Sequence, residues 1–489
     1  MIPPVLKPDD GDSHTEGVKT LMGDPRKAVL KLAIPMIVAM SVQTIYNFVD
    51  ALWVSGLGAD ALSALGFFFP FLFMAMALSN GLGVGASSAI SRRIGSKDKE
   101  GADNVAVHTI VIMVILAAAF SLPLYVLSED IFRLIGAGQT LDMAVSYARV
   151  LFAGIIVLFF SNVANAILRG EGDAKRAMYA MVLGAGLNIV LDPIFIYTFG
   201  LGVAGAAAAT VLSIGVTSLL LAYWLFLKAD TYVSFSFSNF RFSGVILKDI
   251  FKVGLPSSVQ QFSMSLTTLI LNLILVKVGG TDGVAVYSTG WRVVTIAILP
   301  LLGIATAVVP VTGAAFGAAI YERLSLIYHY AIRIGLVIEI GIAVATFLLA
   351  PQIAALFTQA EGASRIAPDL ITFLRIACLF YPGAAFGIMS SATFQGTGKG
   401  TYSLAATLIR TVFLTAPLAY VLAVHLDFGL TGVWWSFVTA NTVGGVISFT
   451  WVELHIRHLR SSGHGPEGPS VPLDSPGSGK MHASPDDGE

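Results

Sequence analysis

Twelve long apolar segments constrain the fold of this 489-residue chain more than any other feature. A membrane-spanning helix needs about 20 mostly apolar residues, because it rises about 1.5 Å per residue through a hydrocarbon core about 30 Å thick. Backbone polar groups cannot face lipid unpaired, so runs of this length must be helical. The segments are 28–54, 61–91, 104–127, 147–168, 177–199, 203–227, 250–276, 283–316, 329–350, 370–394, 403–425 and 430–454. The sequence therefore predicts an all-α membrane protein with twelve transmembrane helices.

Composition excludes most other classes of protein. Only 12% of the residues are charged and the formal net charge is −1, whereas soluble chains carry about 25% charged residues. This composition excludes a disordered chain, a coiled coil and a nucleic-acid-binding protein with a basic face. It nearly excludes a soluble enzyme. The single cysteine, Cys378, permits neither an intrachain disulfide nor a cysteine-based metal cluster. The lipid bilayer is therefore the expected surroundings.

The distribution of basic residues predicts the orientation. If the N-terminus is cytoplasmic, 22 of the 29 Lys and Arg residues fall in cytoplasmic segments and five fall outside. We therefore expect a multi-pass plasma-membrane protein with both termini in the cytoplasm. The polar N-terminal segment 1–27 lacks the apolar core of a signal peptide. The stretch 457–489 ends in a run rich in Gly, Ser, Pro and Asp and is predicted to be a disordered cytoplasmic tail.

The two halves of the apolar region resemble each other. Matching positions recur at offsets of 221 to 229 residues, on either side of a connection at 228–249. They include Pro35 and Pro256, Gly58 and Gly279, Gly95 and Gly317, Gly172 and Gly398, and Gly200 and Gly429. We infer two parallel six-helix bundles, an N-lobe over 28–227 and a C-lobe over 250–456. Parallel repeats of this kind are typical of transporters that expose one site alternately to each side of a membrane.

Two aspartates within the apolar segments have polar residues close to them in the sequence. Asp50 shares one helical face with Gln43, Tyr46 and Asn47, because these residues recur at steps of three and four. Asp192 follows Asn188 by one turn, and Pro193 comes directly after it. The remaining polar groups of this half are Thr210 and the pair Asn162 and Asn165. Carboxylates in hydrocarbon are costly, so both acids are functional candidates, and Pro35 and Pro193 are candidate hinges.

The acids of the first half have no counterparts in the second. At the internal offset, Asp50 corresponds to Leu271 or Asn272. Oxygen atoms of Asp50, Asp192, Asn188 and Thr210 would suit Na⁺, which prefers oxygen ligands. The two carboxyl groups could instead share a proton. A third interpretation is that they are unrelated helix-packing residues, each satisfied by a neighbouring amide.

The motifs resemble those of the multidrug and toxic compound extrusion (MATE) transporters. They are Ile34-Pro35, the run from Gln43 to Asp50, Arg169-Gly170-Glu171-Gly172-Asp173 and the run from Asn188 to Pro193. Both aspartates lie in the first half, as in the archaeal-type branch. The resemblance implies coupling through Asp50, Asn188, Asp192 and Thr210, beside a cavity lined by Gln43, Tyr46, Tyr147, Asn165 and Met181. Sodium-coupled bacterial relatives carry an acid where this chain has Met264, so the resemblance argues against a C-lobe cation site.

We expect a secondary active antiporter that exports amphipathic, cationic, drug-like molecules in exchange for H⁺ or Na⁺. No segment fits the ATP-binding pattern Gly-x-x-x-x-Gly-Lys-[Ser/Thr], so the energy must come from an ion gradient. No cofactor and no catalytic residue are expected, and we expect a monomer. One alternative is a flippase for a lipid-linked precursor, which should carry more intramembrane basic residues than Arg292 and Arg410. Another is an intramembrane aspartyl protease, but such a protease should have Gly-x-Gly-Asp at its membrane aspartate, whereas Ile189, Val190 and Leu191 precede Asp192 here, and proteolysis would not explain the repeat.

Overall fold

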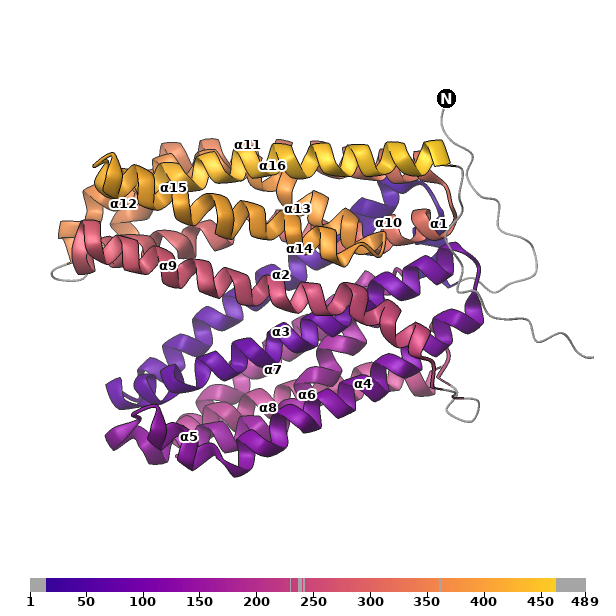
Figure 1. Ribbon diagram of the computed structural model, residues 1–489. Coiled ribbons are helices and arrows are strands. Elements are labelled where there is room, and N and C mark those ends of the chain that lie inside the picture. Colours follow the sequence, from indigo (N-terminus) through magenta and orange to yellow (C-terminus); the bar gives the residue numbers. More distant parts are fainter. Residues whose placement is uncertain (1–14, 229, 236–239, 241, 360–362, 463–489) are drawn as a thin grey trace, which may run out of the picture.

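The structure, a computed structural model, describes residues 15–228, 230–235, 240, 242–359 and 363–462. These ranges contain helices and connecting turns and no strand, which confirms the predicted all-α fold. The helices form two bundles that lie side by side (Figure 1).

The N-terminal bundle consists of six long helices. They are α2 (Pro25–Ser55), α3 (Ala59–Gly95), α4 (Lys99–Val126), α6 (Leu141–Gly170), α7 (Ala174–Pro193) and α8 (Gly202–Ala222), with the short α1 (Glu16–Met22) and α5 (Ser128–Leu134) beside them. An aspartate precedes α2, α4 and α7, and its carboxylate accepts a hydrogen bond from a backbone N–H of the first turn. Such caps satisfy donors that the helix itself leaves unpaired. The three caps, Asp24, Asp98 and Asp173, fix where these helices begin.

The C-terminal bundle repeats the arrangement with more interruptions. Its helices are α9 (Gly244–Ala297), α10 (Leu299–Gly317), α11 (Tyr321–Phe357), α12 (Ala367–Ala377), α13 (Tyr381–Gly396), α14 (Gly400–Leu408), α15 (Ala416–Tyr420) and α16 (Gly429–Ser462). The 54 residues of α9 are two helices joined at Gly280, whose φ of 59° and ψ of −150° are not helical. The seventh predicted span therefore ends there, and the eighth, predicted over 283–316, comprises the rest of α9 together with α10.

The predicted number of spans agrees with the structure. Among the described residues, eleven helices are long and apolar enough to cross a membrane. The less apolar α16 has 34 residues and packs against α13, so it supplies the twelfth span. Most helices extend past the predicted segments by a few residues. Larger extensions occur in α11, which covers Tyr321–Phe357 where 329–350 was predicted, in α9, which begins at Gly244 inside the expected connection, and in α16, which continues to Ser462. Residues 463–489, which hold most of the predicted tail, lie outside the described residues.

Backbone conformation reveals the internal repeat directly. Positive φ values occur at matching positions of the two halves: 60° at Lys97 and 54° at Ala319, and 90° at Gly172 and 75° at Gly398. L-residues rarely adopt this conformation, so its recurrence in non-glycine residues marks equivalent turns. The predicted match between Gly58 and Gly279 is displaced by one residue. The counterpart of Gly58, with a φ of 95°, is Gly280 and not Gly279.

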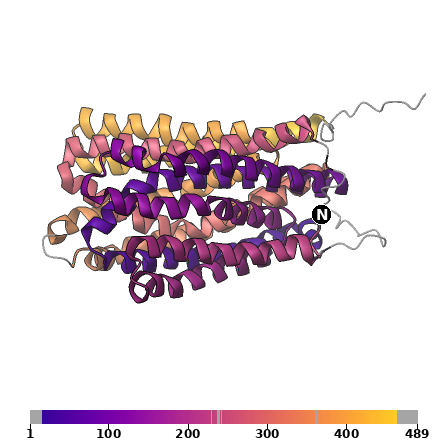
Figure 2. The same ribbon diagram turned by 90° about the horizontal axis from the view of Figure 1, so that it is seen from below.

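The two bundles meet mainly through α3, which packs against α9 and α10, and through α2, which packs against α10. Their ribbons lie close together at the face that carries the N-terminus and diverge toward the opposite face (Figure 1). The end of α16 lies at the same face as the N-terminus in both views (Figures 1 and 2). An even number of spans places both ends of the chain on one side.

Candidate functional site

Asp50 and Asp192 come together because α2 packs against α7. Their carboxyl groups lie within interaction range of each other. The Asp192 side chain is completely buried, and Asp50 is half-buried. Two acidic groups from helices that are more than 100 residues apart in sequence therefore share one small region of the N-terminal bundle.

Four further predicted residues surround the two acids. The Asn188 amide nitrogen donates a hydrogen bond to the Thr210 hydroxyl over 3.3 Å, and that hydroxyl donates to the Ala206 carbonyl over 3.0 Å. The Tyr46 hydroxyl lies within interaction range of Thr210 and of both carboxyl groups. Tyr147 of α6 also lies near the pair. The cluster thus draws on α2, α6, α7 and α8.

Several acceptor atoms in this cluster have no donor. Both carboxyl oxygens of Asp192 and the amide oxygen of Asn188 are buried without a hydrogen-bond partner. Among the described residues, no Lys, Arg or His side chain is a charged or hydrogen-bonding neighbour of either carboxyl group. Buried acceptors without donors are rare, so the cluster has the chemistry of a cation site.

The donor set suits a hard monovalent cation or a proton. In the part of the chain that the structure describes, no group of three or more His, Cys, Asp or Glu side chains could hold a metal ion. The oxygens beyond the two carboxylates would therefore come from the Asn188 amide and the Thr210 hydroxyl. Oxygen ligands of this kind are preferred by hard cations.

Two other predicted site residues form hydrogen bonds with groups outside this cluster. The Asn162 amide donates to the Ser79 hydroxyl over 2.9 Å, and the Asn165 amide donates to the carbonyl of Ser161 in its own helix. The three remaining predicted residues differ in exposure: Gln43 and Met181 are half-buried, and Asn47 is exposed.

Both candidate hinge prolines lie inside helices. Pro35 is buried within α2. Pro193 ends α7, and the chain continues as a π-helix over Ile194–Thr198, which begins two residues after Asp192. A π-turn widens the helix and is frequent at functional sites. The helix geometry therefore changes beside one of the two acids.

Polar residues of the C-terminal bundle are arranged differently. Glu339 in α11 is fully buried, and neither of its oxygens has a partner. Arg410 is buried within a π-helix over Ile409–Thr415. Glu453 lies 3.0 Å from the imidazole of His329, near the end of α16.

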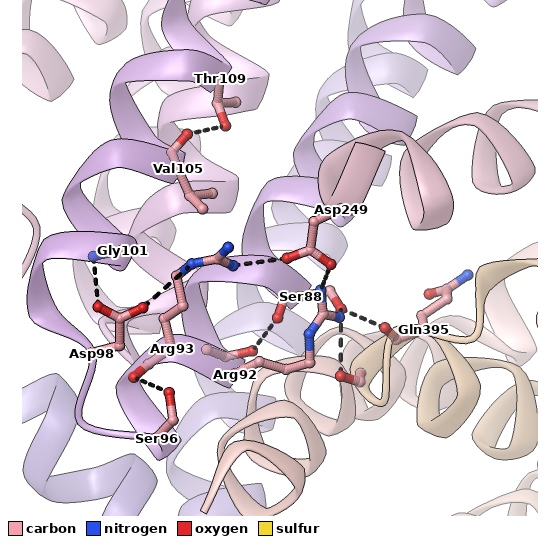
Figure 3. A network of polar contacts seen from close by, with 12 residues as sticks. Ser88, Arg92, Arg93, Ser96, Asp98, Gly101, Val105, Thr109, Asp249 and Gln395 are labelled. Carbon is pink, nitrogen blue, oxygen red and sulfur yellow. Dashed lines mark hydrogen bonds and ion pairs between the residues drawn. The ribbon is translucent and has the colours of Figure 1, made fainter. Parts of the chain in front are cut away.

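A polar network that was not predicted from the sequence joins the two bundles (Figure 3). Arg92 and Arg93 of α3 contact the two carboxylate oxygens of Asp249 in α9, over 2.6 and 2.7 Å. The Arg92 guanidinium also donates to the Ser88 hydroxyl, which donates to the Gln395 carbonyl of α13. No local spacing points to these partners, because 156 and 157 residues separate the arginines from Asp249.

Comparisons with known proteins agree with this architecture. The model of the MatE family matches the chain twice, over residues 35–194 and 256–421, so each half is one copy of the repeat. The multidrug export protein MepA of Staphylococcus aureus (strain N315) is 29% identical over 432 residues, which cover 88% of this chain and 93% of MepA.

Solved structures extend the similarity to three dimensions. One is an outward-facing multidrug resistance MATE family transporter of the MOP superfamily, with 50% sequence identity and a TM-score of 0.89 over 92% of this chain and all of that chain. A MOP superfamily transporter from Pyrococcus furiosus matches with the same identity, TM-score and coverage. The chain therefore belongs to the MatE family, and it is a multidrug efflux transporter that spans the membrane rather than an enzyme.

Proposed function

We propose that this transporter exports amphipathic, cationic, drug-like compounds in exchange for H⁺ or Na⁺ at the paired carboxyl groups of Asp50 and Asp192. The observation that carries the proposal is the pairing itself. The two carboxyl groups are neighbours in the N-terminal bundle, and no basic side chain of the described residues lies close enough to neutralise either charge. Two unneutralised carboxylates in such surroundings are unfavourable, so a cation has to occupy the site for part of the cycle.

The same charges explain why an ion and a drug exclude each other. A bound H⁺ or Na⁺ removes negative charge from the cluster and weakens its attraction for a cationic substrate. Release of the ion restores the attraction. A ligand shifts a conformational equilibrium only through its different affinities for the two states. The exchange is therefore driven by the inward ion gradient.

Helix geometry offers a way for ion occupancy to move the bundle. Asp192 is followed at once by Pro193 and the π-helix over Ile194–Thr198. Asp50 lies in α2, which also contains Pro35. Proline removes a backbone hydrogen bond and weakens the helix locally, so both helices can bend when the charge between them changes.

The remaining proposed properties concern the chain in its membrane. We propose that it acts in the plasma membrane with both termini in the cytoplasm, since Lys and Arg are concentrated in the segments on that side. We also propose that the monomer is the working unit, because the coupling cluster lies wholly within one bundle.

Transport by purified protein in liposomes tests the coupling. H⁺ and Na⁺ gradients are imposed separately, and the movement of a fluorescent organic cation is followed. One of the two gradients should drive export by the natural chain. Asp50→Asn should fold and insert but lose gradient-driven export, because one of the two paired charges is gone.

Asp60→Asn is the matched control. Asp60 is an exposed acid in the first turn of α3, so the same chemical change should leave export intact. Full gradient-driven export by Asp50→Asn would refute the role of the pair. Equal export in the absence of either gradient would refute ion coupling altogether.

A further inference from the structure

A basic pocket lies between the two bundles at the face that carries the chain termini. It has a volume of about 610 Å³ and is lined by residues of α2, α11 and α16. Three arginines line it: Arg26 from the N-terminal bundle, and Arg333 and Arg460 from the C-terminal bundle. The pocket lies apart from the aspartate pair, and the coupling mechanism does not use it.

The pocket has a surplus of positive charge. No carboxylate of the described residues lies within 4.0 Å of any of the three guanidinium groups. The carboxylate in the lining is Glu322, which has no described ion-pair partner of its own. His329 contributes no unpaired charge, because its imidazole already faces Glu453 at 3.0 Å. An anion could therefore bind without displacing an existing ion pair.

Guanidinium groups favour one class of anion. Arginine presents planar N–H donors that match the oxygens of phosphate, and its bonds to phosphate are charge-assisted. Arg26 also lies over the ring of Tyr330, 5.9 Å from the ring centre, which holds its side chain beside the pocket.

The surface next to the pocket is apolar and exposed. Along α11 from Arg333, steps of four, three, four and four residues lead to Val337, Ile340, Val344 and Leu348. These residues share one helix face, and their side chains are between 50 and 73% exposed. A free phosphate ion would make no use of this stripe, whereas an acyl chain would lie along it.

We propose that this pocket binds the phosphate of an anionic phospholipid whose acyl chains lie along the exposed face of α11. Basic pockets between membrane helices suit such head groups. The arginines come from both bundles, so a bound head group links α2 to α11 and α16 and favours the arrangement in which this face is closed.

Native mass spectrometry of the purified full-length transporter tests the proposal. The detergent-solubilised protein is offered phosphatidylglycerol or phosphatidylcholine with the same acyl chains. Phosphatidylglycerol should remain bound and phosphatidylcholine should not. Arg333→Gln and Arg460→Gln should each reduce bound phosphatidylglycerol roughly tenfold, because each removes a charge-assisted contact. Arg457→Gln, an exposed arginine of α16 outside the pocket lining, should change binding by less than about twofold.

Two further arms make the outcome decisive. Glu322→Gln removes the acid from the lining and should increase bound phosphatidylglycerol, a gain that damage to the fold cannot produce. Inorganic phosphate at millimolar concentration should not displace the lipid. Equal retention of both lipids, an equal loss in Arg457→Gln or displacement by inorganic phosphate would overturn the proposal.

Discussion

Gly95 and Gly317 lie at equivalent ends of α3 and α10, and each allows its helix to reach the backbone of the other. A Cβ atom on Gly95 would lie 2.0 Å from the carbonyl oxygen of Ala314. One on Gly317 would lie 1.8 Å from the carbonyl oxygen of Arg92. Each contacted carbonyl is three residues before the opposite glycine, so the contact is reciprocal. A two-fold relation between the repeats requires such reciprocity.

This close approach predicts a large effect of one methyl group. Gly317→Ala should force the two bundles apart where they meet and lower stability by at least about 1–3 kcal/mol, the usual cost of overpacking. Thermal unfolding of the purified protein measures the loss, and drug export should fall with it. Gly341→Ala is the control, because nothing lies within 4 Å of a Cβ at that position of α11. A Gly317→Ala protein as stable and active as the natural chain would contradict the prediction.

Much of the fold could be predicted because the membrane leaves the chain few options. Apolar runs of sufficient length had to be helices, and matching prolines and glycines exposed the repeat. The predictions that failed concerned exact positions, such as which of two adjacent glycines has a positive φ. Gly279 and Gly280 tolerate a positive φ equally well, so no local pattern selects Gly280. The helical continuation of α16 to Ser462 was also missed, since its polar last turns resemble the start of a tail.

The coupling cluster could be predicted only in pieces. Helical spacing put Tyr46 near Asp50 and Asn188 near Asp192. Helical spacing could not show that the two pairs meet, because the packing of α2 on α7 is a long-range property. A shared site was therefore one hypothesis beside that of unrelated helix-packing residues, and the resemblance to a family favoured it. The contact between Arg92 and Asp249 had no such support and was missed.

Asn188→Ala should impair export while leaving the fold intact. The Asn188 amide holds Thr210, and its buried oxygen is without a donor beside the acids. The loss of one ligand or hydrogen bond at a charged site costs about 1.5–3 kcal/mol, or roughly 10- to 100-fold in apparent ion affinity. Proteoliposome transport at graded concentrations of the driving ion measures this shift.

Asn441→Ala provides the comparison for Asn188→Ala. The Asn441 amide donates to the Phe437 carbonyl within its own helix, so the substitution removes the same group from a site without acids. Its dependence on the driving ion should match that of the natural chain. An unchanged ion dependence in Asn188→Ala would exclude that residue from the site.

Glu171 should make stability depend on pH. This carboxyl group lies in the turn between α6 and α7, is 1% exposed, and accepts hydrogen bonds from the backbone N–H groups of Tyr232 and Val233. Burial raises the pKa of Glu171 from 4.5 to about 8 in spite of those two bonds. Between these values the folded chain keeps the proton and the unfolded chain loses it. The free energy of unfolding should therefore fall as the pH rises toward 8, by at most about 1.4 kcal/mol per pH unit.

Unfolding of the natural chain and of Glu171→Gln across this pH range measures the effect. The glutamine variant cannot ionise, so its stability relative to the natural chain should increase with pH. Glu100→Gln, at an exposed acid in the first turn of α4, should show no such trend. Parallel curves for Glu171→Gln and the natural chain would mean that Glu171 does not titrate in this range.

Asp249→Asn should weaken the junction between the bundles. The Asp249 carboxylate contacts Arg92 and Arg93, and the three side chains are only 26, 11 and 12% exposed. Removing the acid leaves two nearly buried guanidinium groups facing a neutral amide, so we expect a loss of roughly 3 kcal/mol in thermal unfolding. Asp282→Asn breaks the ion pair with Arg365, which is far more exposed, and should cost at most about 1 kcal/mol.

The same substitution should also change which state the transporter occupies. Asp249 lies in the second turn of α9, in the C-terminal bundle, and both arginines belong to the N-terminal bundle, so the ion pairs favour closure at this face. Spin labels on cysteines introduced at the exposed positions Ser96, in the N-terminal bundle, and Thr401, in the C-terminal bundle, would report the separation of the bundles. The natural cysteine, Cys378, is buried and should not compete for the label. Asp249→Asn should shift the distances to longer values, and an unchanged distribution would show that the network stabilises the fold without governing the opening.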